Sequence, residues 1–381
     1  MPYTYAPPAL TDLNREQRMA HGWKDASKDV LILTGCPGSG KTTVSMLRNG
    51  GLDCSKRHYA VYANLLRGYL INSAAQLNVP ESFFSTFHSW LWWNSGGWTP
   101  PPDKPRQLGD QLNAWFVRWS KSQPVKYTEY TLDEGQDLPL EVRCALSHFA
   151  KTLVISMDEA QDVRDECQGN ELQRTVTYLQ DELGKTVACF KLNKNWRNTQ
   201  AVFDFAKFIV PEMNSLTQGI DFNQGTGDKP QFLKLDTEQE YNVELTRIIR
   251  NETGVNVAVL SDSLIKLREI HSVLKLAGME VTIYDSQVFQ RLKTREKTAF
   301  LKNMSNVVLS TFQSCKGLEF DTVILADVGG MSDTLPKRKG YYVGCTRARN
   351  KLVLLFDRSG GEMPGWLQRM TIQNPELFEE F

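Results

Sequence analysis

The chain has 381 residues, of which 41% are hydrophobic and 23% charged, values typical of a globular protein with room for two domains. Lys and Arg together number 44, as do Asp and Glu, so contacts with nucleic-acid phosphates would have to come from local patches rather than from net charge. The sequence shows no membrane-spanning apolar run, no signal peptide and no metal-ligand spacing among its seven cysteines. We therefore expect a cytoplasmic protein without membrane association.

Strand-like and helical segments alternate through the first half of the chain. Residues 30–35, "VLILTG", form an apolar run of the kind buried in a parallel sheet, and a short helix is expected before it over 14–21, with Thr11 as its N-cap. A small insertion is expected at about 90–126, where Gly and Pro are frequent. Further strands are expected at "HYAVYANL", "KYTEYTLD", "KTLVISMD" and "TVACFKL". The alternation predicts a doubly wound α/β domain over residues 1–190.

A second alternating series predicts another α/β domain over residues 191–365. Its strands are expected at "PQFLKL", "VNVAVLS", "MEVTIYD", "NVVLSTF", "DTVILADV" and "NKLVLLF". Residues 366–381 are interpreted as a C-terminal tail whose acidic last residues form a loose end.

A phosphate-binding loop is predicted directly after the first apolar strand. The segment "GCPGSGKT" fits the pattern G-x-x-x-x-G-K-[ST] between a strand and a helix, the context in which backbone N–H groups surround phosphate oxygens. Lys41 would bind the β- and γ-phosphates, and the Thr42 hydroxyl would bind Mg²⁺. The pattern therefore predicts ATP and Mg²⁺ as cofactors. The expected nucleotide contacts of the loop are Gly35, Cys36, Pro37, Gly38, Ser39, Gly40, Lys41, Thr42 and Thr43.

Six segments in order resemble the motifs of the UvrD/Rep/PcrA-like DNA helicases of superfamily 1. Besides the phosphate loop, they are "LNREQ", "STFHSW", "NKNWRNT", "LSTFQSCKGLEFDTVIL" and "YYVGCTRARNKL". Six ordered matches are far more specific than any one of them. The resemblance implies an α/β fold of two tandem RecA-like P-loop NTPase domains with parallel sheets, and one ATP bound by residues from both.

The resemblance also implies roles for particular residues. Gln17 would hold the adenine base, which suits an amide because it both donates and accepts hydrogen bonds. Arg197 and Arg347 would contact the γ-phosphate, where positive charge stabilises the transition state, and Glu319 would lie near the ribose. Phe87 and Trp90 have an equally good interpretation as core aromatics. The residues implied in nucleic-acid binding are Thr86, Phe87, His88, Trp90 and Thr311.

Two acidic pairs compete for the catalytic role. By hydrophobicity alone, Asp158–Glu159 follows the better buried strand, but the order of motifs in the family favours Asp133–Glu134. If the later pair bound Mg²⁺, the next strand should supply a D-x-x-Q motif, and it carries the Asn-Trp-Arg motif instead. The resemblance then assigns Asp133 to Mg²⁺ through water, Glu134 as the general base for the attacking water, and Gln161 as the γ-phosphate sensor.

The chain departs from the family in its inserted regions. The intervals 90–126 and 286–305 leave room for only a small first insertion and almost no second one, so the parts that help to split a duplex are reduced. The first interpretation is an ATP-dependent single-stranded-DNA translocase or helicase that moves 3′ to 5′. The alternative is a DNA-triggered ATPase subunit that gates a protein partner such as a nuclease without productive unwinding. RNA stays open as the substrate, because both nucleic acids are handled by the same core.

Overall fold

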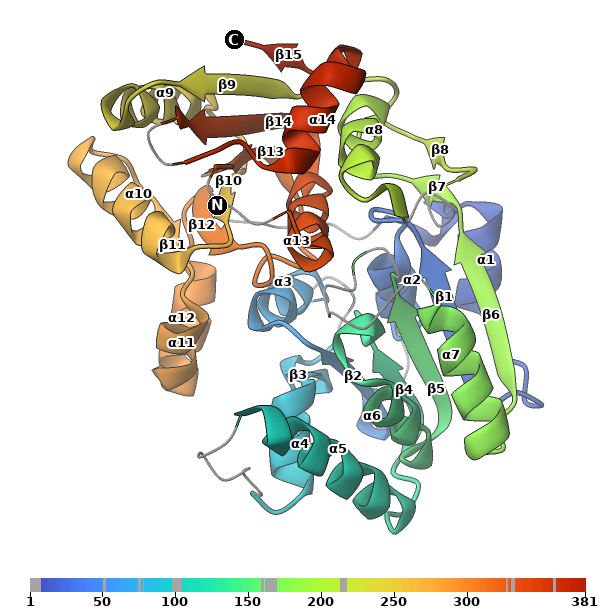
Figure 1. Ribbon diagram of the computed structural model, residues 1–381. Helices are drawn as coiled ribbons and strands as arrows, with labels where there is room; N and C mark the ends of the chain where they lie inside the picture. The colour runs from blue at the N-terminus through green and yellow to red at the C-terminus, as the bar shows by residue number, and fades with distance from the viewer. Residues whose placement is uncertain are drawn as a thin grey trace. The chain divides into compact units, whose positions relative to one another are not determined.

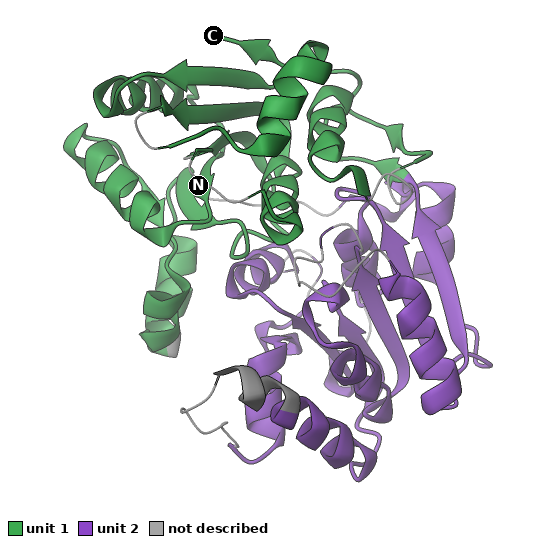
Figure 2. Cartoon of the chain, in the orientation of Figure 1, with its two compact units in different colours: residues 1–4, 163–166, 194–381 green, residues 5–162, 167–193 purple. Residues whose placement is uncertain are grey.

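The structure is a computed structural model with two compact units (Figure 2). Unit 2 takes in most of the first half of the chain up to Asn193, and unit 1 consists mainly of Lys194–Phe381. Because the two units are separate bodies, each is treated by itself. The described residues are 8–50, 53–74, 77, 79–97, 105–158, 161, 170–212, 218–326, 328–329, 333–358 and 361–381.

Unit 2 contains a six-stranded parallel sheet in the order β3-β2-β4-β5-β1-β6 (Figure 1). Its strands are β1 (Val30–Gly35), β2 (Arg57–Val61), β3 (Phe84–Thr86), β4 (Tyr127–Leu132), β5 (Ala150–Met157) and β6 (Val187–Leu192). Its helices are α1 (Arg15–Gly22), α2 (Lys41–Leu47), α3 (Asn64–Ala74), α4 (Phe87–Asn94), α5 (Pro105–Lys121), α6 (Leu140–Ala145) and α7 (Glu171–Thr177).

The alternation of apolar side chains along β1 explains why helices cover both faces of this sheet. Val30 and Ile32 belong to one core cluster, with residues of α4, α5 and α6, whereas Leu31 and Leu33 belong to another, with residues of α1 and α2. A strand buried on both faces has no polar side, which is why it reads as a continuous apolar run. Strands β4, β5 and β1 are neighbours, so the chain segments that follow them meet at one edge of the sheet.

Unit 1 contains a seven-stranded parallel sheet in the order β11-β12-β10-β13-β14-β9-β15. Its strands are β9 (Gln231–Leu235), β10 (Val257–Ser261), β11 (Thr282–Ile283), β12 (Val307–Thr311), β13 (Phe320–Leu325), β14 (Ala348–Asp357) and β15 (Glu379–Glu380), and β7 (Lys194–Asn195) pairs separately with β8 (Asp221–Phe222). Its helices are α8 (Gln200–Ile209), α9 (Glu238–Asn251), α10 (Leu264–Leu276), α11 (Ser286–Arg291), α12 (Thr294–Lys302), α13 (Leu335–Cys345) and α14 (Gly365–Gln373). The predicted fold class, two α/β units with parallel sheets, is confirmed.

The C-terminal segment is not the loose tail that the sequence suggested. Strand β15 pairs with β9 and forms the edge of the sheet, and α14 buries Trp366 and Met370. The Trp366 ring lies 5.2 Å from that of Tyr341 in α13, measured between ring centres. The acidic side chains of Glu379 and Glu380 remain exposed while their backbone extends the sheet, so composition alone misled the prediction.

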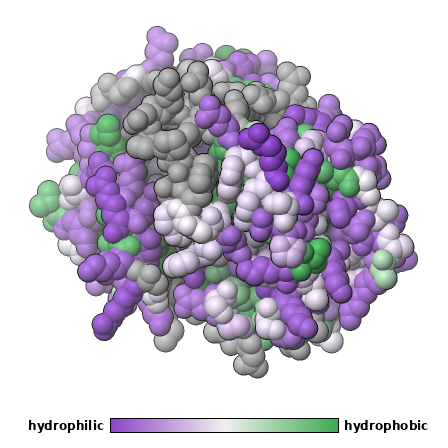
Figure 3. Space-filling view, turned by 90° about the horizontal axis from the view of Figure 1, so that it is seen from below, coloured by the Kyte–Doolittle hydropathy of each residue, from purple (hydrophilic) through white to green (hydrophobic). Residues whose placement is uncertain are grey.

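Hydrophilic side chains dominate the face shown in Figure 3, and hydrophobic ones are scattered across it. None of the described helices is long and apolar enough to span a membrane.

Acid stability is expected to depend on His58. Burial, and secondly the charge of Lys126, lower the pKa of this histidine to about 3 from its usual 6.5, and its Nε2 lies 2.8 Å from the Ser85 hydroxyl. Between these pH values the unfolded chain takes up a proton that the folded chain does not, so the free energy of unfolding falls as the pH falls. Between pH 7 and pH 5 this proton uptake lowers the free energy of unfolding of the wild type by about 2 kcal/mol, and we expect His58→Asn to lack this decrease. The measurement is urea unfolding at the two pH values. Parallel pH dependences for the variant and the wild type would contradict this.

Candidate nucleotide-binding site

The phosphate loop connects β1 to α2 and curls around the ammonium of Lys41. Lys41 Nζ donates to the carbonyl oxygens of Gly35, at 2.8 Å, and Cys36, at 3.0 Å, and lies 3.5 Å from Asp158 Oδ2. Gly40 has a φ of 87°, a left-handed conformation that starts the helix and that glycine adopts without strain. The loop thus has the geometry of a phosphate cradle whose lysine is already paired with a carboxylate.

Asp133 follows β4 and forms a small buried cluster with two hydroxyl groups. Tyr59 Oη donates to Asp133 Oδ2 at 2.9 Å, and the Thr42 hydroxyl also bonds to this carboxylate. Burial and then the charge of Glu134 raise the pKa of Asp133 to about 6, although the hydrogen bonds from Thr42 and Tyr59 oppose the shift. Nearby positive charge would reverse this effect, and a carboxylate beside a threonine hydroxyl is a donor set that suits Mg²⁺.

The protein offers few ligands to a metal at this site, so a metal here would take most of its ligands from water and phosphate. Among the described residues, no cluster of three or more His, Cys, Asp or Glu side chains could hold a metal ion. Mg²⁺ bound at Thr42 and Asp133 would therefore complete its shell with water and phosphate oxygens, as is usual for this ion.

Glu134 is the one non-glycine residue with a positive φ in the described part of the chain. Its φ of 54° and ψ of 46° place it in the left-handed region, which is costly for a residue with a Cβ and concentrates at functional sites. The next residue must be glycine, because a Cβ on Gly135 would lie 2.5 Å from Ile155 Cγ2. The turn after β4 is therefore pressed against β5, and it presents Glu134 in a strained conformation.

The two acidic segments belong to one hydrogen-bonded network. The Gln136 amide donates to Glu134 Oε2 at 2.5 Å and accepts the backbone N–H of Asp158 at 3.0 Å. Asp158 Oδ2 in turn accepts from Gln161 Nε2 at 2.9 Å. Asp158, the first residue of the competing pair, is thus part of the same site. Glu159 lies outside the described residues.

Gln136 is a site residue that the sequence reasoning missed, and Asp158 was weighed only as a rival of Asp133. The contact of Asp158 with Lys41 follows from strand order, because a residue at the end of β5 lies between the ends of β4 and β1. The predicted residues Lys41, Thr42, Asp133, Glu134 and Gln161 are all brought together at this edge of the sheet in unit 2.

Gln17 lies against the phosphate loop, and both ends of its amide make hydrogen bonds. Its Oε1 accepts the N–H of Asn14 at 3.1 Å, and its Nε2 donates to the carbonyl of Ser39 at 3.0 Å. The side chain is 3% exposed, and a Cβ on Gly40 would lie 2.6 Å from its Nε2. Asn14, rather than Thr11, is the N-cap of α1, and Gln17 completes its capping box.

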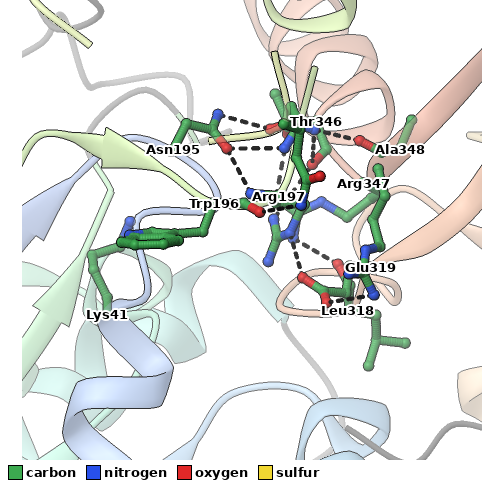
Figure 4. Close-up of polar contacts among 12 residues, drawn as sticks. Lys41, Asn195, Trp196, Arg197, Leu318, Glu319, Thr346, Arg347 and Ala348 are labelled. Carbon is green, nitrogen blue, oxygen red and sulfur yellow. Dashed lines mark hydrogen bonds and ion pairs between the residues drawn. The ribbon is translucent and has the colours of Figure 1, made fainter. Parts of the chain in front are cut away.

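In unit 1, Arg197 is held by a carboxylate and a carbonyl (Figure 4). Its Nε donates to Glu319 Oε2 at 2.8 Å, and its Nη1 donates to the carbonyl of Thr346 at 3.3 Å. Arg349 also approaches Glu319, at 3.6 Å. Burial raises the pKa of Glu319, but the charge and hydrogen bond of Arg197, and then the charges of Arg349 and Arg347, leave the pKa below its usual value. Glu319 is thus an anion that holds two arginines.

Arg347 is buried, and its guanidinium bonds to its own unit. Nε donates to the carbonyl of Val343 at 3.0 Å, Nη1 to that of Leu318 at 3.3 Å, and Nη2 to the Thr346 hydroxyl at 3.3 Å.

Of the residues implied in nucleic-acid binding, the two large aromatic ones are buried and the two threonines bond within the protein. Phe87 and Trp90 are 4% and 2% exposed and belong to the core of unit 2, where the Trp90 indole donates to Tyr127 Oη at 3.0 Å. This corrects their assignment, because buried rings have no free face on which a base could stack. The Thr86 hydroxyl is buried and caps α4, and that of Thr311 bonds to Ser314.

His88 is exposed and forms an aromatic pair that the sequence did not suggest. Its ring lies 5.6 Å from that of Tyr62, edge to face, and Tyr62 is 42% exposed. Tyr62 follows β2 and His88 follows β3, so both belong to the edge of the sheet where the phosphate loop lies.

Comparison with solved structures identifies the fold of the chain. Dbp5 from S. cerevisiae, solved with RNA and ADP BeF3, matches 96% of this chain and 89% of its own, with 11% identity and a TM-score of 0.56. The chain therefore has the fold of RecA-like helicases, with a phosphate loop at the expected sheet edge. The C-terminal domain of a possible DNA helicase from Lactobacillus plantarum WCFS1 matches 49% of this chain and 98% of its own, with 22% identity and a TM-score of 0.36. The PRRSV helicase matches 87% of this chain and 52% of its own, with 14% identity and a TM-score of 0.42.

Residues 306–355 match the UvrD-like helicase C-terminal domain. This segment holds β12, β13, α13 and most of β14, together with Glu319 and Arg347. The match confirms the resemblance to UvrD-like helicases that the motifs predicted. The sequence matches no curated protein.

Proposed function

We propose that this chain is an ATP-dependent single-stranded-DNA translocase or helicase of the UvrD-like type, which moves 3′ to 5′ as it hydrolyses ATP. The observation that carries the proposal is the arrangement at one sheet edge in unit 2. There Lys41 and Thr42 follow β1, Asp133 and Glu134 follow β4, and β5 with Asp158 at its end lies between these two strands. The match of residues 306–355 to a helicase domain gives this site its context.

Each residue then has a role that its surroundings support. Lys41 would exchange Asp158 for the β- and γ-phosphates, and Thr42 and Asp133 would hold Mg²⁺. When bound, Mg²⁺ supplies positive charge that neutralises the developing charge on the phosphates. Glu134 would accept the proton of the attacking water at its carboxylate, and Gln161 would contact the γ-phosphate from the end of β5.

Unit 1 would complete the site with positive charge. Arg197 and Arg347 are proposed to contact the γ-phosphate, and Glu319 to lie near the ribose. Because Glu319 holds Arg197 in this structure, binding of ATP would transfer the guanidinium from a carboxylate to a phosphate. Gln17 is proposed to read the adenine with the donor and acceptor capacity left by its present bonds.

The alternative, a DNA-triggered ATPase subunit that gates a nuclease or another partner, is favoured by the small inserted regions. In the first interval, α5 packs Phe116 into the core of unit 2, and in the second only the short helices α11 and α12 are present among the described residues. Within the described residues of the two intervals, neither interval forms a separate body that would help to split a duplex.

Turnover and strand displacement separate these functions. We would measure ATP hydrolysis with single-stranded DNA, single-stranded RNA or no nucleic acid, and displacement of a strand from a duplex with a 3′ tail. Stimulation with displacement supports the helicase, and stimulation without displacement supports the gating subunit. No hydrolysis under any of these conditions would contradict both.

Nucleic-acid binding is expected to depend on Tyr62. Stacking of one base on an aromatic ring contributes about 1–3 kcal/mol, so Tyr62→Ala should raise the DNA concentration that gives half-maximal stimulation by about 10-fold. Trp93→Ala is the matched control, because Trp93 is 80% exposed but lies in the last turn of α4, away from the start that carries His88. Equal effects of the two substitutions would argue against a Tyr62 contact.

A further inference from the structure

Gln136 is a fully buried amide that uses both of its ends within the site. Its side chain is 0% exposed, its Nε2 donates to Glu134 Oε2 at 2.5 Å, and its Oε1 accepts the N–H of Asp158 at 3.0 Å. Its two side-chain hydrogen bonds join the turn after β4 to the end of β5.

The donor end suits the control of a general base. Glu134 follows the buried carboxylate of Asp133, whose negative charge repels it, and its backbone is strained. A neutral amide can fix the direction of such a carboxylate without the strong loss of basicity that an adjacent arginine or lysine would cause. Gln136 therefore orients Glu134 and leaves it able to accept a proton.

The acceptor end connects the same amide to the phosphate loop. Asp158, whose N–H the amide accepts, lies 3.5 Å from Lys41 Nζ and accepts a hydrogen bond from Gln161. Phosphates that displace Asp158 from Lys41 would remove one contact at the end of β5. A shift of Asp158 would move the N–H group to which Gln136 bonds. Binding of phosphate in the loop would thus change the position of Glu134 through Gln136.

We propose that Gln136 is the positioning residue that holds the Glu134 carboxylate in place for water activation and ties it to the end of β5. This inference rests on the proposed ATPase function. It assigns to Gln136 a large effect on the hydrolysis step and only a small one on nucleotide affinity, because its hydrogen bonds reach Glu134 directly and the phosphate loop only through Asp158.

Two substitutions separate the two ends of the amide. Q136M keeps the length of the side chain but loses both hydrogen bonds. Q136E keeps an oxygen that can accept the N–H of Asp158, but it removes the donor to Glu134 and places a like charge beside it. We expect both variants to lower kcat by about 10- to 100-fold, the effect of losing a hydrogen bond to a charged group, with nucleotide affinity changed less than about 2-fold. Q173M is the matched control, because it makes the same chemical change at an exposed position of α7.

A double substitution tests whether Gln136 acts through Glu134. If it does, Q136M should lower the residual turnover of E134Q by less than about 2-fold, whereas a general structural defect would lower it further. Unchanged kcat in Q136M and Q136E, equal losses of kcat and nucleotide affinity, or additive effects with E134Q would each overturn the inference. If E134Q alone retains normal turnover, the proposed catalytic base is wrong, and that failure is distinct from failure of the Gln136 inference.

Discussion

Glu134→Gln is expected to abolish ATP turnover while nucleotide binding is retained. The amide keeps the shape of the side chain but cannot accept a proton from the attacking water, a contribution of about 10²- to 10⁴-fold. Binding should survive because Lys41 and Thr42 are unchanged. The measurements are steady-state ATP hydrolysis with saturating single-stranded DNA, and the affinity for a fluorescent ATP analogue.

Glu159→Gln is the control, since it makes the same change in the competing acidic pair and should have a milder effect. At Glu134 itself, the positive φ and the hydrogen bond from Gln136 support its assignment as the base. An equal loss in the two variants, or the opposite ranking, would overturn the assignment of the base.

Arg197→Ala is expected to lower kcat by about 10³-fold or more, with a much smaller change in nucleotide affinity. An arginine that contacts the transferred phosphoryl group stabilises charge that is largest in the transition state, so its loss appears in the chemical step. The measurement is single-turnover hydrolysis of bound ATP in the presence of single-stranded DNA.

Arg349→Ala provides the matched control. Arg349 has the same charge and approaches the same Glu319, but its side chain is 41% exposed, whereas that of Arg197 is 13% exposed. We expect Arg349→Ala to change kcat by less than about 3-fold, the range of an exposed ion pair. Comparable losses in both variants would mean that the arginine cluster acts through Glu319 rather than through a phosphate contact of Arg197.

Much of the fold could be predicted because its signals are local. The apolar runs of β1 and β5 are continuous because both faces of the sheet are covered. The glycines before Lys41 indicate the phosphate loop. The C-terminal strand could not be predicted in this way. Glu379 and Glu380 pair through their backbone, and nothing in two exposed acidic side chains indicates a neighbouring strand.

The sequence proposed several of the residues that meet at this sheet edge, but not the contacts between them. Motif order selected Asp133 and Glu134, yet the partnership of Lys41 with Asp158 depends on which strands are neighbours, and the sequence does not record that order. The burial of Phe87 and Trp90 was equally hidden. An aromatic residue at the start of a helix has the same local pattern whether its ring faces the core or solvent.

The contact between Lys41 and Asp158 has a consequence for selectivity. A carboxylate beside an ammonium offsets much of its charge, so Lys41 paired with Asp158 attracts monovalent anions only weakly. Under the proposed function, a ligand must carry enough negative charge to displace Asp158 from Lys41. A triphosphate would do so better than a single phosphate, because Lys41 would meet its β- and γ-phosphates together. Asp158 would thus set the minimum charge of a ligand that the loop accepts.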